Sequence, residues 1–211
     1  MKSKMNAREV LSLAAVVPVM TVDDAAAAVD LARALVDGGL PVLEITLRSG
    51  AALDAIARIA AEVPDAVVGA GTVRNARMLD EVVDAGARFA ISPGINAPFA
   101  AAAAACSVPV IPGIATPGEL MLALEHGLDT LKLFPAETVG GVGMLKSLYG
   151  PFPDVRFCPT GGIDPVKAAD YLALPNVLCV GGTWLAPKEM LAARDWAGVR
   201  RLAEQAAALR G

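Results

Sequence analysis

A single lysine interrupts an apolar run near the middle of the chain. Lys132 lies between Leu131 and Leu133, and the alternation of a strand would turn it to the face opposite those leucines. Lysine is seldom buried without a partner, and burial disfavours its charged form. An uncharged amine can attack a carbonyl group and form a Schiff base. The position therefore predicts a nucleophilic amine, with an ion pair or a solvated sheet face as the alternatives.

A glutamate and an arginine accompany a second apolar run. Glu44 and Arg48 have the same parity in and just after residues 42–46, so a strand would direct both to one face. A carboxylate near an amine can move protons as a general acid or base. An arginine can hold a substrate carboxylate through two parallel hydrogen bonds, although Arg48 could also pair with Glu44 or with a surface carboxylate. Thr72, which follows the next apolar run, could assist this grip or cap a helix.

Two glycine pairs follow the last two apolar runs of the chain. They belong to the sequences Thr-Gly-Gly at 160–162 and Gly-Gly-Thr at 181–183. Glycine allows backbone N–H groups to approach an anion, and a following helix N-terminus adds a favourable dipole. One such pair is a weak signal, because glycine is also an ordinary turn residue. Two pairs on adjacent strands predict a phosphate site.

Strands and helices must bring these candidate residues together. Eight apolar runs are the expected strands, at residues 16–20, 42–46, 66–70, 88–92, 108–111, 130–134, 155–159 and 177–180. They begin 20 to 26 residues apart, about the length of one strand, loop and helix. The expected helices are a short one before the first strand and those at residues 23–37, 51–62, 75–85, 100–105, 117–125, 165–172 and 195–209. Asn75 and Asp164 are expected N-caps, and Pro117 fits a first helical turn.

The order of these elements predicts the fold class. Strands that alternate with helices indicate an α/β fold with a parallel sheet, and eight such units indicate a (β/α)8 TIM barrel, here with a short N-terminal helix. No linker divides residues 1–211, so we expect a single domain. An open doubly wound sheet is the alternative, but the G-x-G-x-x-G turn that usually follows its first strand is missing after Met20.

A barrel of this kind would bring the side chains of Glu44 and Lys132 face to face. Its active site lies at the carboxyl ends of the strands, and its interior layers come from alternate strands. Glu44 on the second strand and Lys132 on the sixth are therefore expected in one layer, facing each other. A buried ion pair that only fills the barrel is the structural alternative. Such pairs seldom gain stability over apolar packing, so we favour a catalytic role.

Composition argues against several classes of partner. The chain has 211 residues, a net charge of −4 and no basic block, so we expect no nucleic-acid partner. No apolar segment is long and uninterrupted enough to span a membrane. Basic residues before the apolar run 10–20 loosely imitate a signal peptide, but Pro18 interrupts that run. We therefore expect a helix and a first strand there, in a cytoplasmic protein.

The cysteines and the single histidine point to no metal chemistry. Cys106, Cys158 and Cys179 form no C-x-x-C pair, and we expect three buried thiols in a reducing compartment. His126 is the only histidine, which excludes a multi-histidine metal site. It precedes Gly127 and is expected at the end of a helix.

Seven stretches of the chain, taken in order, resemble one enzyme family. The sequence is similar to the KDPG/4-hydroxy-2-oxoglutarate aldolases, class I aldolases that act on 2-keto-3-deoxy-6-phosphogluconate in the Entner–Doudoroff pathway. The matching stretches are Val17–Val19, Leu43–Arg48, Val68–Val73, Phe89–Gly94, Leu131–Glu137, Arg156–Ile163 and Gly181–Leu185. The resemblance runs from the first expected helix to the last.

The resemblance implies a role for each candidate residue. It implies that Lys132 forms the Schiff base and that Glu44 is the general acid and base. It implies a substrate-binding site made of Arg48, Thr72, Pro93, Phe134, Thr160, Gly161, Gly162, Gly182 and Thr183, with Arg48 and Thr72 at the pyruvyl carboxylate and the glycines and Thr183 at the phosphate. The family usually has serine where this chain has Thr183, which keeps the hydroxyl and adds a methyl group at the phosphate end.

The same resemblance implies the reaction and the partners. The expected reaction cleaves 2-dehydro-3-deoxy-6-phosphogluconate, a phosphorylated keto acid, to pyruvate and glyceraldehyde 3-phosphate. Cleavage of 4-hydroxy-2-oxoglutarate to pyruvate and glyoxylate could accompany it. The family implies a homotrimer and no metal or cofactor.

Two other functions are compatible with the same barrel. One is a phosphosugar epimerase or a phosphate-transferring synthase, and the other is a sugar-phosphate binding protein without turnover. Neither requires a Schiff base, so the lysine at position 132 together with Glu44 favours the aldolase.

Overall fold

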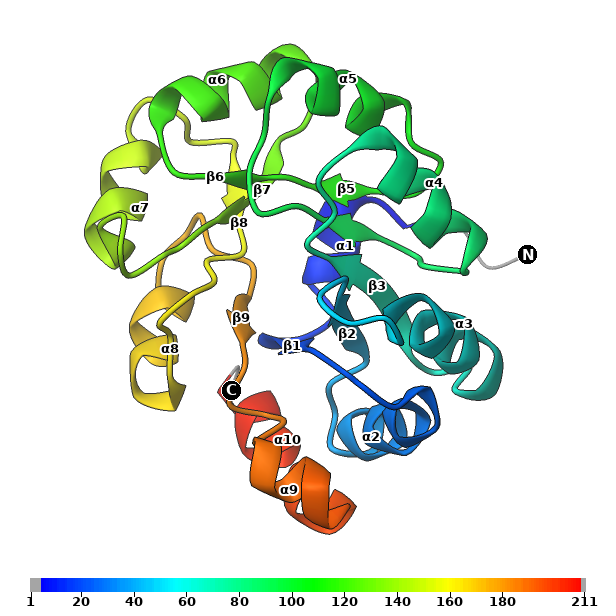
Figure 1. Cartoon of the computed structure of the whole chain (residues 1–211). Helices are drawn as coiled ribbons and strands as arrows, with labels where there is room; N and C mark the ends of the chain where they lie inside the picture. Colours follow the sequence, from blue (N-terminus) through cyan, green and yellow to red (C-terminus); the bar gives the residue numbers. More distant parts are fainter. Residues whose placement is uncertain (1–4, 210–211) are drawn as a thin grey trace.

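The computed structural model describes residues 5–209, in which parallel strands alternate with helices (Figure 1). The strands are β1 (Val16–Met20), β2 (Val42–Thr46), β3 (Val67–Gly71), β4 (Ala90–Ile91), β5 (Val110–Ile111), β6 (Gly113–Ile114), β7 (Thr130–Leu133), β8 (Arg156–Phe157) and β9 (Val180–Gly182). The helices are α1 (Ala7–Leu11), α2 (Ala25–Asp37), α3 (Ala52–Glu62), α4 (Ala76–Asp84), α5 (Ala97–Ala105), α6 (Pro117–Glu125), α7 (Gly141–Tyr149), α8 (Pro165–Leu172), α9 (Lys188–Ala193) and α10 (Trp196–Ala207). The predicted α/β class is confirmed.

The strands form two parallel sheets. Six strands pair in the order β5-β4-β3-β2-β1-β9, and three pair in the order β6-β7-β8. Only Pro112 separates β5 from β6, and proline has no N–H to donate to a ladder. Isolated parallel bridges join Phe157 to Val177 and Thr160 to Gly181. The six-stranded sheet is curled, and the helices lie outside the strands, except for α1, which lies inside the ring of strands (Figure 1).

Several predicted strands are shorter than the apolar runs that indicated them. The run 88–92 contains only β4, and the run 155–159 contains only β8. In the second case Pro159 stands where a further ladder N–H would be needed. The helices α7 and α9 were not predicted. The start of α7 was missed because glycines 140, 141 and 143 lie there, and glycine is unfavourable inside a helix.

Local signals at the helix ends behave as predicted. The Asn75 side chain accepts a hydrogen bond from the Met78 N–H, 2.9 Å away, at the start of α4. Asp164 caps α8. His126 is the C-cap of α6, and Gly127 follows it with φ of 73°.

The two faces of the strands bury different sets of side chains. Residues such as Leu43 and Ile45 of β2 pack in one cluster with the surrounding helices. Residues of the opposite parity form a second cluster, whose members are Val10, Leu11, Val17, Val42, Val67, Phe89, Ile91, Ile111, Cys158 and Cys179. Glu44 has the parity of Val42 and therefore lies on this inner face. The helix α1 contributes the first two members of the inner cluster.

The prediction of three buried thiols is correct for two of them. Cys158 and Cys179 are buried in the inner cluster. Cys106 is half-buried instead, because it is the C-cap of α5, where the chain leaves the helix.

Candidate active site

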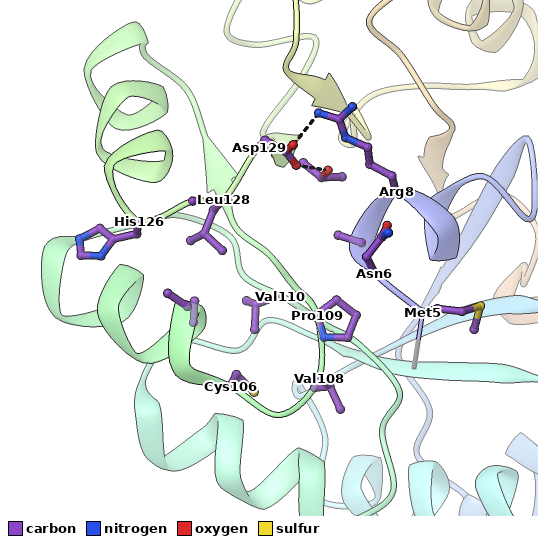
Figure 2. Close-up of a pocket in the computed structure, with 15 residues that line it drawn as sticks. Met5, Asn6, Arg8, Cys106, Val108, Pro109, Val110, His126, Leu128 and Asp129 are labelled. Carbon is purple, nitrogen blue, oxygen red and sulfur yellow. Dashed lines mark hydrogen bonds and ion pairs between the residues drawn. The ribbon is translucent and has the colours of Figure 1, made fainter. Parts of the chain in front are cut away.

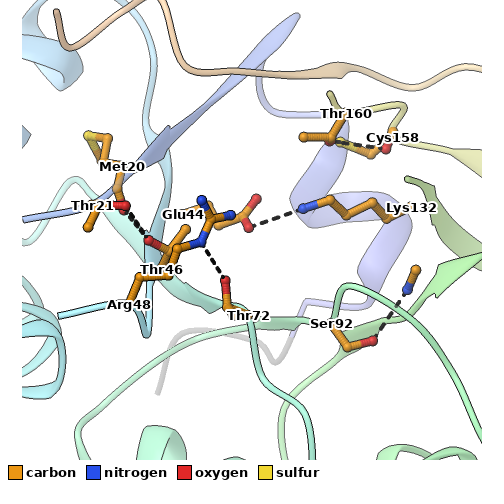
Figure 3. A network of polar contacts seen from close by, with 11 residues as sticks. Met20, Thr21, Glu44, Thr46, Arg48, Thr72, Ser92, Lys132, Cys158 and Thr160 are labelled. Atoms are coloured by element: carbon orange, nitrogen blue, oxygen red, sulfur yellow. Dashed lines mark hydrogen bonds and ion pairs between the residues drawn. The ribbon is translucent and has the colours of Figure 1, made fainter. Parts of the chain in front are cut away.

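A buried lysine and a buried glutamate meet on the inner face of the strands. Lys132 Nζ of β7 lies 3.3 Å from Glu44 Oε1 of β2, and the two side chains are 5% and 1% exposed (Figure 3). This confirms the prediction that the two side chains face each other. The Lys132 Nζ also lies 5.1 Å from the centre of the Phe134 ring. The carboxylate and the ring are both favourable neighbours for a lysine head group.

The second oxygen of the glutamate has no partner. Glu44 Oε2 is buried and accepts no hydrogen bond from residues 5–209. A carboxylate oxygen left in this state costs about 1–3 kcal/mol, so it is poorly explained as a device for stability. The unpaired oxygen is better explained by a functional role, in which it accepts a hydrogen bond from a bound ligand or a proton during the reaction.

Gly71 provides the space in which the glutamate lies. A Cβ atom at Gly71 would come within 2.1 Å of Glu44 Oε1 and within 2.8 Å of its Cδ. Gly71 ends β3, which pairs with β2 in parallel. The neighbouring strand therefore leaves the carboxylate room on the inner face.

Arg48 and Thr72 lie together, as predicted, at the ends of β2 and β3. Arg48 Nε donates a hydrogen bond to Thr72 Oγ1 at 3.2 Å (Figure 3). Among residues 5–209 Arg48 takes part in no ion pair, so the alternative of a pair with Glu44 is wrong. Thr72 has φ of 63°. That conformation is unfavourable for a β-branched residue by about 1–3 kcal/mol, and such strain clusters at functional sites.

Pro93 is held by contacts that the sequence did not indicate. The buried Ser92 hydroxyl donates to the Gly94 carbonyl at 2.7 Å and accepts from the Gly113 N–H at 3.3 Å. A Cβ atom at Gly113 would lie 2.5 Å from the Pro93 carbonyl carbon. The loop after β4 therefore packs tightly on β6.

The two glycine pairs are neighbours. The bridge between Thr160 and Gly181 brings the segment after β8 beside β9. A Cβ atom at Gly181 would lie 2.2 Å from Thr160 Oγ1, so the close approach requires glycine. Gly161 and Gly162 have φ of 108° and 78°, which L side chains rarely adopt. The predicted proximity of the two pairs is confirmed.

Comparison with known proteins identifies the family. The model of "Aldolase: KDPG and KHG aldolase" matches residues 7–202. The chain belongs to this aldolase family. It is 53% identical over 203 residues to the KHG/KDPG aldolase of Escherichia coli strain K12, covering 96% of this chain and 95% of that one. It is 51% identical over 205 residues to the 2-dehydro-3-deoxy-phosphogluconate aldolase of Pseudoalteromonas atlantica, covering 97% and 95%.

Solved aldolases have the same fold. The KDPG aldolase of Legionella pneumophila, with pyruvate captured at low pH as a covalent carbinolamine intermediate, superposes with a TM-score of 0.94 at 41% identity, covering 97% of this chain and 100% of that one. The 2-keto-3-deoxy-6-phosphogluconate aldolase of Zymomonas mobilis ZM4 with 3-phosphoglycerate superposes with a TM-score of 0.92 at 48% identity, covering 98% and 97%.

The aldolase also has a cavity at the amino ends of its strands, opposite the carboxyl ends that Arg48 and Thr72 follow (Figure 2). This cavity of about 520 Å³ is lined by residues of α1 and α5 and by the segments that lead into β5 and β7. Arg8 and Asp129 form an ion pair of 2.6 Å at its edge. None of the predicted site residues lines it. In barrels that end of the strands serves stability, and catalysis takes place at the other end.

Within residues 5–209 no group of three or more His, Cys, Asp or Glu side chains is placed to hold a metal ion. Over the same part of the aldolase, no helix is long and apolar enough to cross a membrane.

Proposed function

We propose that this aldolase cleaves 2-dehydro-3-deoxy-6-phosphogluconate to pyruvate and glyceraldehyde 3-phosphate through a Schiff base on Lys132. One observation carries the proposal: the Lys132 amine lies 3.3 Å from the Glu44 carboxylate on the buried inner face. The nucleophile and a group that can take or give its protons are thus within reach of each other. The covalent pyruvate adduct of the Legionella relative supports the same type of chemistry.

The mechanism follows from these two side chains. The Lys132 amine adds to the C2 ketone, and loss of water gives a protonated imine that acts as an electron sink. Glu44 takes the proton of the C4 hydroxyl, directly or through a water molecule, and the C3–C4 bond breaks. Glyceraldehyde 3-phosphate leaves, and the enamine is protonated at C3. Hydrolysis of the resulting imine releases pyruvate and the free amine.

The remaining site residues are proposed to hold the two ends of the substrate. Arg48 and Thr72 bind the pyruvyl carboxylate, and Pro93 and Phe134 line the reacting carbons. Thr160, Gly161, Gly162, Gly182 and Thr183 bind the phosphate end. The clustering of the glycine pairs supports this division, as does the phosphorylated ligand of the Zymomonas relative. Thr183 is exposed at the end of β9, where its hydroxyl is accessible to a phosphate.

A second substrate is 4-hydroxy-2-oxoglutarate, cleaved to pyruvate and glyoxylate. The name of the Escherichia coli relative, KHG/KDPG aldolase, supports this activity. The substrate shares the pyruvyl half and lacks the phosphate. We therefore propose that it uses Lys132, Glu44 and Arg48 without the glycine pairs.

We further propose that the two sheets belong to one closed (β/α)8 barrel that forms a single domain over residues 1–211. The single-residue gap at Pro112 and the bridge from Thr160 to Gly181 support closure. The family resemblance supports a homotrimer, which light scattering on the purified protein would test. It also supports a cytoplasmic location.

Reductive trapping tests the Schiff base. Borohydride added with pyruvate should attach one adduct per chain, and peptide mass analysis should place it on Lys132. Lys132→Ala should abolish both the adduct and turnover, and Lys132→Arg should do the same because a guanidinium stays protonated. Lys146→Ala, which removes an exposed lysine of α7, is the control and should keep both. An adduct that persists in Lys132→Ala would refute the assignment. An epimerase or a binding protein would give no adduct.

A further inference from the structure

Three polar side chains form a cluster beside the Gly161–Gly162 turn. Glu137, which lies in the loop after β7, accepts a hydrogen bond from the Tyr171 hydroxyl at 2.5 Å. Its other oxygen lies 2.7 Å from Lys167 Nζ. Tyr171 and Lys167 both belong to α8, and Tyr171 is 1% exposed. We call Glu137, Tyr171 and Lys167 the Glu137 cluster.

The cluster contacts the glycine turn directly. Lys167 Nζ donates to the Gly162 carbonyl at 3.1 Å, and the Glu137 N–H donates to the Gly161 carbonyl at 3.1 Å. A Cβ atom at Gly162 would lie 2.8 Å from Glu137 Cγ. Both glycines have positive φ. Glycine adopts this conformation readily but is flexible, so contacts from neighbouring residues are needed to keep the turn in one conformation. The Lys167 side chain and the Glu137 backbone therefore bind two consecutive carbonyl groups of the turn.

The same cluster connects the glycine turn to the strand of the proposed nucleophile. Glu137 is five residues beyond Lys132 in the sequence. Between them, the Ala136 N–H donates to the Thr160 carbonyl at 2.8 Å. The loop after β7 and the loop after β8 are thus hydrogen-bonded to each other at successive residues, and α8 fixes both through Tyr171 and Lys167. The position of the turn relative to Lys132 depends on these contacts.

Charge compensation is a second property of the cluster. The hydrogen bond from Lys167, and then that from Tyr171, hold the pKa of Glu137 below its ordinary value, so the carboxylate is charged at neutral pH. The same hydrogen bond raises the pKa of Lys167. A bare carboxylate beside a phosphate site would repel the phosphate. Lys167 offsets that charge while it binds the turn.

We propose that Glu137, Tyr171 and Lys167 are positioning residues that set the affinity of the Gly161–Gly162 turn for the phosphate end of the substrate, an inference that rests on the function proposed above. The cluster acts through the turn and does not take part in bond cleavage. It should therefore affect phosphorylated ligands and leave reactions of the pyruvyl half unchanged.

Three substitutions and one control separate this role from simple stabilisation. Tyr171→Phe removes one hydroxyl, Glu137→Gln removes the charge, and Lys167→Met removes the compensating cation while keeping an aliphatic stem. Glu81→Gln removes a comparable carboxylate, which is paired with Arg77 2.8 Å away on α4. For each protein we would measure KM for 2-dehydro-3-deoxy-6-phosphogluconate, the dissociation constant of inorganic phosphate by calorimetry, and the rate of borohydride trapping with pyruvate.

The proposal expects a selective loss. Tyr171→Phe and Lys167→Met should raise KM and the phosphate dissociation constant by about three- to tenfold, which is the range for the net contribution of a typical hydrogen bond. Pyruvate trapping should stay within about twofold, because Lys132 and Glu44 are untouched. Glu137→Gln added to Lys167→Met should restore part of the phosphate affinity by removing the uncompensated charge. Glu81→Gln should resemble the wild type.

Other outcomes overturn the inference. An unchanged phosphate dissociation constant in Tyr171→Phe and Lys167→Met would refute it, and so would an equal loss of trapping and phosphate affinity together with a lower melting temperature. The proposed function fails by a different result, the absence of a pyruvate adduct in the wild type. Calorimetry with inorganic phosphate needs no turnover, so the comparison of phosphate affinities decides on the cluster in that case too.

Discussion

Substitution of Gly71 should disable Glu44 without changing any group that takes part in the chemistry. In Gly71→Ala the new Cβ would lie 2.1 Å from Glu44 Oε1, whereas contacts to a Cβ below 3.0 Å are essentially never found. The carboxylate must therefore retreat by roughly 1 Å, and misplacements of that size cost about 10²-fold in rate. Glu44 Oε1 also lies 3.3 Å from Lys132 Nζ, so a retreat of the carboxylate changes its contact with the lysine.

Steady-state cleavage of 2-dehydro-3-deoxy-6-phosphogluconate measures this effect. We expect kcat to fall by about 10²-fold in Gly71→Ala, while the pyruvate adduct still forms on Lys132. Overpacking also destabilises by about 1–3 kcal/mol, so rates must be taken well below a measured melting temperature. Gly143→Ala is a matched control, because a Cβ there meets nothing within 4 Å and the residue lies within α7. It should keep the wild-type rate.

A double-mutant cycle tests whether the loss passes through Glu44. Glu44→Gln alone should lower kcat by about 10²–10⁴-fold. If Gly71→Ala acts by moving this carboxylate, it should cost much less in the Glu44→Gln background than in the wild type. Additive losses would refute the reasoning, and so would a kcat of Gly71→Ala within about threefold of the wild type.

Two further predictions concern other parts of the site. Arg48→Ala should raise KM more than it lowers kcat, because a carboxylate grip acts in the ground state and the transition state alike; a selective fall in kcat would contradict it. The free energy of unfolding should be more sensitive to acid in the wild type than in Glu137→Gln, because hydrogen bonds from Lys167 and then Tyr171 hold the pKa of Glu137 below 4.5. A lowered pKa gives stability that is present above the unfolded value and is lost as the pH falls through the folded value. Urea unfolding should therefore show that the difference in the free energy of unfolding between the two proteins closes below about pH 4.5. A difference that does not change with pH would be evidence against this account.

Much of the fold was predictable because local rules govern it. The period of the apolar runs indicated the parallel strands, and the caps at Asn75 and Asp164 indicated where α4 and α8 begin. The prediction failed where a local signal was weak. Helix α7 begins among glycines, and β4 and β8 are much shorter than the apolar runs that contain them.

The proximity of Glu44 and Lys132 was also predictable, since parity and strand order place both on one inner face. The supporting residues were not. Gly71 makes room for Glu44 from a different strand, and Ser92 contacts Gly113 across 21 positions of sequence. The sequence around Gly71 or Ser92 contains no local pattern that predicts these contacts.

The sequence by itself determined which side chains could do chemistry, because residue type and strand alternation depend only on the order of the chain. Only the tertiary structure decided how those side chains are held. The unpartnered Glu44 Oε2, the bond from Arg48 to Thr72 and the attachment of Glu137 to α8 depend on separate elements meeting within a few ångströms. Distances on that scale follow from the packing of whole strands and helices, and sequence spacing does not specify them.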